Sequence, residues 1–139
     1  MALQADAPDM TVHPVEPTGF DDVTRSLATG KITRNNSLTG SICDAIITPQ
    51  PGDLTFPILH RLCGAGLTVT DDQALAAVAA AFTHLRVVAE PGGAVALAAA
   101  LFCPHDLTSN TVIVTISGGN IDPDMFQRAL ALPPTTGQT

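Results

Sequence analysis

Apolar and polar positions change their spacing along the chain, and each change indicates a different element. Residues 70–84 carry Leu75, Val78 and Phe82 at helical spacing, with alanines at most of the remaining positions, and residues 91–102 form a second alanine-rich helical segment. A helix that is apolar nearly all round is expected to be largely buried. Residues 111–116 form instead an unbroken β-branched run, which is typical of a strand covered on both faces.

Local signals mark the ends of these elements. Thr70 and Gln73 have the spacing of a capping box, and Gly30 is a typical helix C-cap. Strands that alternate with helices indicate an α/β fold with a largely parallel sheet. The remaining expected elements are a last helical turn over 1–5, strands over 10–16 and 67–69, helices over 21–29, 54–63 and 122–130, and a loop over 31–54.

Composition limits the classes of function. The 139 residues suffice for one domain, and the net charge is −7 with only six Lys and Arg, which do not cluster. No basic face is therefore expected for nucleic acid or for an anionic membrane. The apolar run 94–103 is too short to span a bilayer, and no signal peptide is visible. Three separated cysteines read as reduced, buried thiols, so a cytoplasmic location is expected.

Two glycine pairs are candidate sites. Ser117, Gly118, Gly119 and Asn120 lie between a predicted strand and a helix, where open α/β sheets bind ligands. Glycines there let the backbone approach a ligand, although the spacing alone favours a plain turn. Glu90 precedes a second glycine pair at a helix start, where its carboxylate either caps the helix or points into a pocket.

An acidic turn is a third candidate. Glu16, Asp21 and Asp22 could share a hard cation with a backbone carbonyl. The alternative is a solvated turn whose carboxylates serve the next helix, and the spacing alone favours that alternative. The four histidines show no metal-binding spacing.

Five motifs in this order resemble the threonine dehydratase and serine racemase family of pyridoxal-phosphate enzymes, which have the tryptophan-synthase-β-like fold. The motifs are Glu-Pro-x-x-x-Asp-Asp from residue 16, Ile-x-Asp-x-Ile around Asp44, Leu-Thr-Val-Thr-Asp-Asp from residue 67, Glu-Pro-Gly-Gly-Ala from residue 90, and Val-x-Val-x-x-Ser-Gly-Gly-Asn from residue 112. The resemblance runs from about residue 3 to residue 130. It implies that residues 1–132 form the C-terminal portion of a catalytic module with a mostly parallel sheet flanked by helices. Residues 133–139 are expected to form a disordered tail.

The resemblance also implies roles for individual residues. Ser117 matches a serine that hydrogen-bonds the coenzyme's pyridine nitrogen, and Gly118, Gly119 and Asn120 match the turn that shapes this contact. Glu90 matches a glutamate close to the coenzyme ring, and it is the candidate catalytic residue of this chain. The ligands of a divalent-cation site, usually magnesium or calcium, match Glu16, the carbonyl oxygen of Phe20, and Asp22. Phe20 departs from the small residue that the family often has there, and Ala45 replaces a common glycine.

Two parts of the family's active site have no counterpart here. The lysine that binds the coenzyme covalently and the glycine-rich loop that cradles its phosphate lie, in the family, before the strand that ends at Glu16. The only lysine, Lys31, matches no catalytic position. We therefore expect the isolated chain to be inactive without an N-terminal half. Its exposed apolar surface should favour association, including a homo-oligomer.

The reaction that the resemblance implies is β-elimination from the amino acids L-threonine or L-serine, giving a 2-oxo acid and ammonia. Serine racemisation on the same scaffold is the nearest alternative. A third possibility is a non-catalytic fragment that acts as a structural or binding module.

Overall fold

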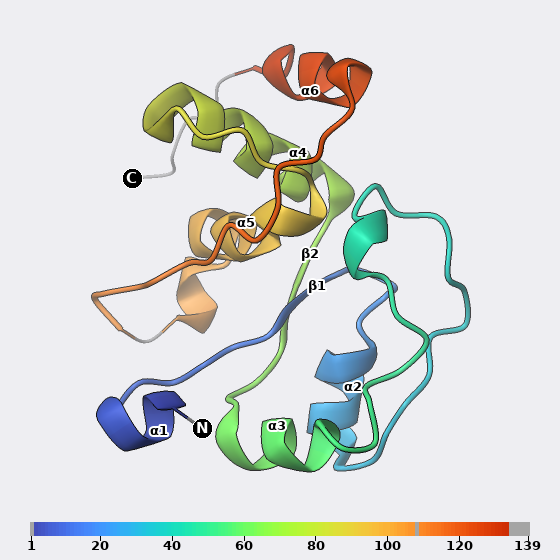
Figure 1. Cartoon of the computed structure of the whole chain (residues 1–139), viewed down its shortest axis with the longest axis vertical. Coiled ribbons are helices and arrows are strands. Elements are labelled where there is room, and N and C mark those ends of the chain that lie inside the picture. Colours follow the sequence, from blue (N-terminus) through green and yellow to red (C-terminus); the bar gives the residue numbers. More distant parts are fainter. Residues whose placement is uncertain (1, 108, 134–139) are drawn as a thin grey trace.

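Two short parallel strands lie at the centre of the computed structural model, which describes residues 2–107 and 109–133, and helices lie around them (Figure 1). The longer elements are α1 (Ala2–Asp6), β1 (Val15–Pro17), α2 (Asp22–Thr29), α3 (Phe56–Leu62), β2 (Leu67–Val69), α4 (Asp71–Ala80), α5 (Val95–Phe102) and α6 (Pro123–Leu130). Between them are the 3₁₀ turns η1 (Asp44–Ile46), η3 (Gly92–Ala94) and η4 (Pro104–Asp106), and the π-helical turn η2 (Ala81–Leu85).

The sheet is parallel, as the sequence predicts. Val15 pairs with Leu67 and Pro17 with Val69, and an isolated parallel bridge joins Val12 to Cys63. The strand expected over 10–16 is therefore shorter than predicted and ends one residue later. Within the described residues, the sheet consists of β1 and β2 alone.

Small side chains build most of the core. Helix α4 buries Ala74, Leu75, Ala77 and Val78. Alanine lets helices and strands approach closely, at the cost of little buried area for each side chain. The predicted burial of this alanine-rich helix is confirmed. Helix α5 buries Val95, Ala98 and Ala99.

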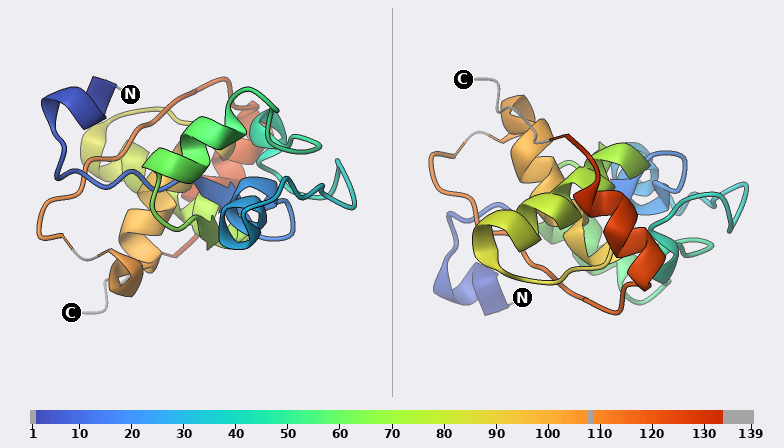
Figure 2. Two further views of the ribbon diagram at one scale, coloured as in Figure 1. Left: turned by 90° about the horizontal axis from the view of Figure 1, so that it is seen from below. Right: turned by 90° about the horizontal axis from the view of Figure 1, so that it is seen from above.

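Helix α6 covers α4 from the outside (Figure 2). Phe126 of α6 meets Phe82, in the π-helical turn after α4, edge to face with ring centroids 5.2 Å apart. Edge-to-face contacts of this kind add to the energy of apolar burial.

Helix ends follow the local signals. The Gln73 N–H donates to Thr70 Oγ1 over 3.2 Å, and the Thr70 N–H donates to Gln73 Oε1 over 2.8 Å. Gly30 ends α2 in the left-handed conformation with φ of 68°. The capping box and the glycine C-cap are both confirmed.

The strand predicted over 111–116 is wrong. Among the described residues, no backbone–backbone hydrogen bond involves this segment. Val112 is 45% exposed and Ile113 is 77% exposed. β-branched residues favour a strand only when a neighbouring strand offers pairing and cover, and β1 and β2 pair with each other instead.

Other expectations meet mixed outcomes. All three cysteines are free, but only Cys43 is buried, whereas Cys63 and Cys103 are half-buried. The predicted tail falls on residues 133–139, of which 134–139 lie outside the described residues. No helix in the described part of the chain is long and apolar enough to cross a membrane.

Removing the Thr70 hydroxyl should destabilise the fold. Thr70→Ala deletes the side-chain acceptor of the capping box, and the expected cost is about 1 kcal/mol in the free energy of unfolding. Urea unfolding followed by circular dichroism measures this loss. Thr70→Ser keeps the acceptor and should remain close to the parent, so equal losses in both variants would contradict the capping role.

Candidate functional site

The two glycine pairs of the sequence lie against each other. The Glu90 N–H donates to the Gly118 carbonyl over 3.0 Å, and the Ser117 N–H donates to the Gly93 carbonyl over 3.3 Å. We call the two segments, residues 88–93 and 117–119, the glycine clasp. It joins the start of η3 and α5 to the segment that leads into α6.

Close backbone approach makes glycine necessary in the clasp. A Cβ atom on Gly93 would lie 2.6 Å from the Gly118 carbonyl oxygen, and one on Gly119 would lie 2.6 Å from the Val88 carbonyl oxygen. Real Cβ atoms essentially never approach that closely, so any side chain at either position would force the two segments apart.

The Glu90 carboxylate rests on Gly118. A Cβ atom on Gly118 would collide with Glu90 Oε1. Glu90 is half-buried and follows Ala89, which has no exposed surface. The structure therefore brings the predicted catalytic glutamate directly to the Ser-Gly-Gly turn.

Ser117 is exposed at the rim of the clasp. Its N–H is held by Gly93, and no hydrogen bond among the described residues involves its hydroxyl oxygen. The hydroxyl can therefore meet an incoming group. Asn120 is also exposed and follows the clasp without being part of it.

Sequence reasoning singled out both glycine pairs but missed that they bind each other. It also missed the Val88 carbonyl, against which Gly119 packs. The available signal was the repeated Gly-Gly pair, at 92–93 and at 118–119. Neither pair is only a flexible turn: Gly93 leaves room for the Gly118 backbone, Gly118 for the Glu90 side chain and Gly119 for the Val88 carbonyl.

The clasp could form one face of a coenzyme site. The described residues offer no lysine beside it to bind the coenzyme covalently. An exposed neutral hydroxyl on a glycine turn can contact a planar ring closely. Lys31, the chain's only lysine, is exposed in the loop after α2. Asp44 is exposed at the start of η1.

Glu16 is the middle residue of β1, and its side chain caps the N-terminus of α2. Its carboxylate accepts the N–H of Val23 over 3.0 Å, and both the N–H and the hydroxyl of Thr24 over 2.7 Å each. Unpaired N–H groups at a helix start favour a carboxylate in this position. Glu16 is only 9% exposed, so these donors are its main partners.

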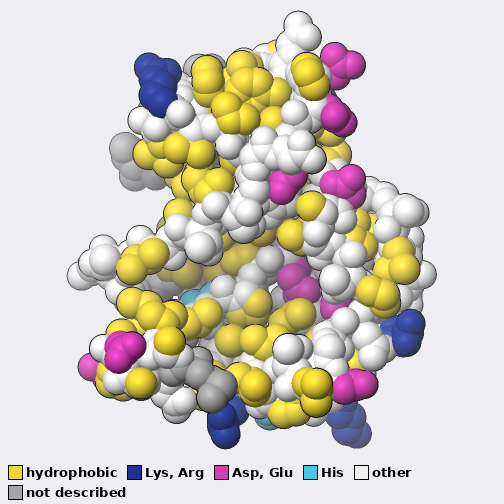
Figure 3. Space-filling model, in the orientation of Figure 1, with side chains coloured by type: hydrophobic (Ala, Val, Ile, Leu, Met, Phe, Trp, Pro, Cys, Tyr) yellow, Lys and Arg dark blue, Asp and Glu magenta, His cyan; other side chains and the backbone are white. Residues whose placement is uncertain are grey.

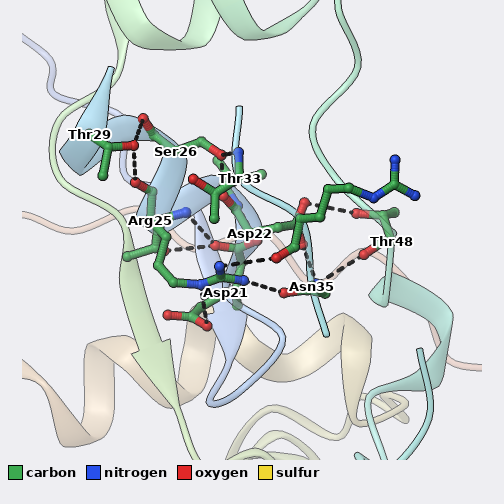
Figure 4. A network of polar contacts seen from close by, with 12 residues as sticks. Asp21, Asp22, Arg25, Ser26, Thr29, Thr33, Asn35 and Thr48 are labelled. Carbon is green, nitrogen blue, oxygen red and sulfur yellow. Dashed lines mark hydrogen bonds and ion pairs between the residues drawn. The ribbon is translucent and has the colours of Figure 1, made fainter. Parts of the chain in front are cut away.

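Asp22 is held by a separate polar network (Figure 4). The Asn35 amide donates to one carboxylate oxygen over 2.6 Å, and the Thr48 hydroxyl donates to the other over 3.3 Å. The same Asn35 side chain accepts from Arg25 over 2.6 Å. The network fastens the loop of residues 35–48 to α2.

The two carboxylates of the predicted cation site are already hydrogen-bonded in this structure. The Glu16 and Asp22 carboxylates face hydrogen-bond donors, which a cation would have to displace. In the part of the chain that the structure describes, no three His, Cys, Asp or Glu side chains are grouped for metal binding. The cation site of Glu16, Phe20 and Asp22 remains a prediction from the resemblance.

Burial raises the pKa of Glu16 and of all three cysteine thiols. It raises the pKa of Glu16 above its usual 4.5, although the hydrogen bonds from Thr24 and Val23 act in the opposite direction. Burial also raises the pKa of the Cys43 thiol to about 11. A thiol that stays protonated is a poor nucleophile, so Cys43 is a core residue.

The model of the pyridoxal-phosphate dependent enzyme family matches residues 1–118. The chain belongs to this family.

Curated relatives and solved structures agree. Serine racemase of Dictyostelium discoideum is 32% identical over 88% of this chain and 39% of the relative. L-threonine ammonia-lyase of Thermotoga maritima is 30% identical over 94% of this chain and 32% of the relative. The crystal structure of the T.th. threonine deaminase superposes with a TM-score of 0.81 at 36% identity, over 87% of this chain and 43% of that one. The chain thus spans less than half the length of these relatives.

Adding one methyl group to Gly118 should destabilise the fold through a clash with Glu90. Gly118→Ala places a Cβ atom on the Glu90 carboxylate, and overpacking of this kind typically costs about 1–3 kcal/mol of stability. The double variant Glu90→Ala/Gly118→Ala removes the obstacle and should recover part of the loss. Urea unfolding of the parent, the two single variants Gly118→Ala and Glu90→Ala, and the double variant gives the coupling energy between the two positions. Strictly additive losses would contradict the contact.

The charge of Glu16 should make stability depend on pH. Burial raises the pKa of Glu16 in the folded chain. Protonated Glu16 therefore contributes its full stability below pH 4.5, and this contribution is lost as the pH rises through the folded-state pKa. Relative to Glu16→Gln, which carries no charge, the parent should become less stable from acidic to neutral pH and then level off. Unfolding free energies at a series of pH values measure this difference. A parent that gains stability over Glu16→Gln as the pH rises would contradict it.

Proposed function

We propose that this chain is the C-terminal part of the catalytic module of a threonine/serine dehydratase. The observation that carries the proposal is the glycine clasp, which holds Ser117 exposed beside Glu90 on a glycine turn. Family membership supports the coenzyme, pyridoxal 5′-phosphate. The names of the relatives, both ammonia-lyases and racemases, support an amino acid substrate.

Ser117 has the simplest role in this proposal. Pyridoxal phosphate, when bound, supplies an electron sink for bond changes at the substrate's α carbon. The Ser117 hydroxyl is neutral, so it can hydrogen-bond the pyridine nitrogen without stabilising a proton on it. A weaker sink of this kind favours β-elimination over chemistry that needs a long-lived carbanion. Glu90, whose carboxylate packs on Gly118, would hold that carboxylate near the ring.

The proposed reaction removes the α proton and the β hydroxyl of L-threonine or L-serine as water. The resulting enamine takes up water and releases ammonia and a 2-oxo acid. In this proposal a lysine in the part of the module that this chain does not span takes the α proton, because Lys31, the chain's only lysine, matches no catalytic position of the family. The chain alone should therefore be inactive.

There are two alternative functions. Racemisation of serine uses the same scaffold, and the Dictyostelium discoideum relative carries that name. A non-catalytic structural or binding module would keep the fold without needing an exposed Ser117. The predicted magnesium or calcium ion at Glu16, the Phe20 carbonyl and Asp22 is not needed for either reaction step above.

Complementation tests the function. The purified chain should release no ammonia from L-threonine. Co-expression with the part of the T.th. threonine deaminase that the chain does not span should restore turnover and the visible absorbance of bound coenzyme. Ser117→Ala should lower kcat by about one to two orders of magnitude, the loss expected for one hydrogen bond.

Ser37→Ala is the matched control, because Ser37 is exposed in a loop of the long 31–54 connection. Ammonia release by the isolated chain would refute the need for a second part. Formation of D-serine without ammonia would favour the racemase alternative, and coenzyme binding without either product would favour the non-catalytic module.

A further inference from the structure

The acidic turn between β1 and α2 carries a cationic side chain of its own. Arg25 projects from α2 into the polar network of Figure 4, where its guanidinium makes three hydrogen bonds. Nε donates to the Asp21 carboxylate over 3.1 Å, Nη1 to the Arg34 carbonyl over 3.1 Å, and Nη2 to the Asn35 amide oxygen over 2.6 Å. A guanidinium holds several acceptors in fixed directions, so Arg25 joins α2 to the loop that follows it.

Asn35 links Arg25 to the buried Asp22 carboxylate. The Asn35 amide accepts from Arg25 through its oxygen and donates through its nitrogen to Asp22 Oδ1 over 2.6 Å. Asp22 is only 1% exposed, and a buried carboxylate is stable only where hydrogen bonds or a positive charge compensate for its lost hydration. Arg25 and Asn35 together supply both.

The Glu16 carboxylate faces the positive end of a helix. Two backbone N–H groups and one hydroxyl at the start of α2 donate to it over 2.7 to 3.0 Å. The N-terminus of a helix stabilises an anion, whereas a divalent cation in contact with the same carboxylate would face these N–H groups. This donor arrangement disagrees with the divalent cation that the resemblance implies.

Arg25 is one of few positive charges in the chain. The sequence has six Lys and Arg against 13 Asp and Glu. On the face shown in Figure 3, the Lys and Arg side chains lie singly at the edge of the molecule. The positive charge at the acidic turn is therefore a local feature of this turn and not part of a basic surface.

We propose that Arg25 takes the place of the divalent cation at the acidic turn, so that the chain holds β1, α2 and the following loop together without a metal ion. Arg25 compensates Asp21 directly and Asp22 through Asn35, and the N-terminus of α2 compensates Glu16. The proposal concerns the folding of this chain and is independent of the reaction that the module catalyses.

Melting of the purified chain with and without a divalent cation tests the proposal. Calcium or magnesium at about 10 mM is enough to fill even a weak protein site. The Tm, followed by circular dichroism, should differ by less than about 1 °C between either cation and EDTA, whereas a bound cation would raise it by about 4 °C or more. Such a rise in the parent that is absent from Asp22→Asn would place a cation at the turn and overturn the proposal.

Two arginine variants test the role of the guanidinium. Arg25→Gln should lower the Tm in EDTA by about 4 °C or more, and calcium should restore part of this loss, because the carboxylates have lost their compensating charge. Arg34→Gln is the matched control, because the Arg34 guanidinium donates to Gln50 on the exposed surface. It should show neither effect. Equal losses in the two variants, or an Arg25→Gln variant that does not respond to calcium, contradicts the replacement.

Amide hydrogen exchange of α2 gives the same comparison if the chain melts without a cooperative transition. The amides of residues 22–29 should exchange slowly in the parent, with or without calcium. Exchange that calcium slows by about tenfold or more would show that a cation orders the turn. Fast exchange under both conditions would show that the network does not form. Either result overturns the proposal.

Discussion

The backbone's need for hydrogen-bond partners governs this structure more than any single side chain. Buried N–H and C=O groups are nearly always paired, so extended segments are stable where they find a neighbour. β1 and β2 find one in each other. The glycine clasp satisfies Glu90 and Ser117 in the same way, through a carbonyl on the opposite segment. Residues 111–116 find no such neighbour in the described chain, and their strand does not form.

Small residues make this pairing geometrically possible. The alanines of α4 and α5 let both helices lie close to the strands, and the glycines of the clasp let two backbone segments touch. Either arrangement would be lost if a larger side chain entered. The low content of large apolar groups is therefore part of how the clasp is positioned, although it leaves each contact with little buried area.

The sequence predicted those structural features that depend on residues close together along the chain. The capping box at Thr70, the left-handed glycine at Gly30 and the alanine-rich buried helix α4 all follow from local chemistry. The strand at 111–116 was predicted from the same kind of pattern and was wrong. β-branched residues favour an extended conformation, but a strand forms only if a segment far away in the sequence pairs with it. The clasp was missed for a related reason. The sequence of a glycine pair does not identify the group that packs against the glycines.

For two carboxylates as well, the contacts in the structure differ from those that the sequence implied. Glu16 and Asp22 match the cation site that the resemblance implies, yet each accepts hydrogen bonds in this structure: from Val23 and Thr24 for Glu16, and from Asn35 and Thr48 for Asp22. A buried carboxylate needs donors or a cation, and the helix N-terminus meets that need first. The raised pKa of Glu16 indicates that burial outweighs even these donors.

Ser117 directly follows the segment whose strand does not form, and this links the unpaired segment to the clasp. The Ser117 N–H donates to the Gly93 carbonyl, whereas residues 111–116 before it make no backbone–backbone hydrogen bond among the described residues. The Ser117 backbone is therefore held from the side of the clasp alone. Because an extended segment is fixed only where its backbone groups are paired, pairing of 111–116 would restrain Ser117 from the other side as well. The position of the exposed Ser117 hydroxyl thus depends on a segment that the clasp itself does not fix.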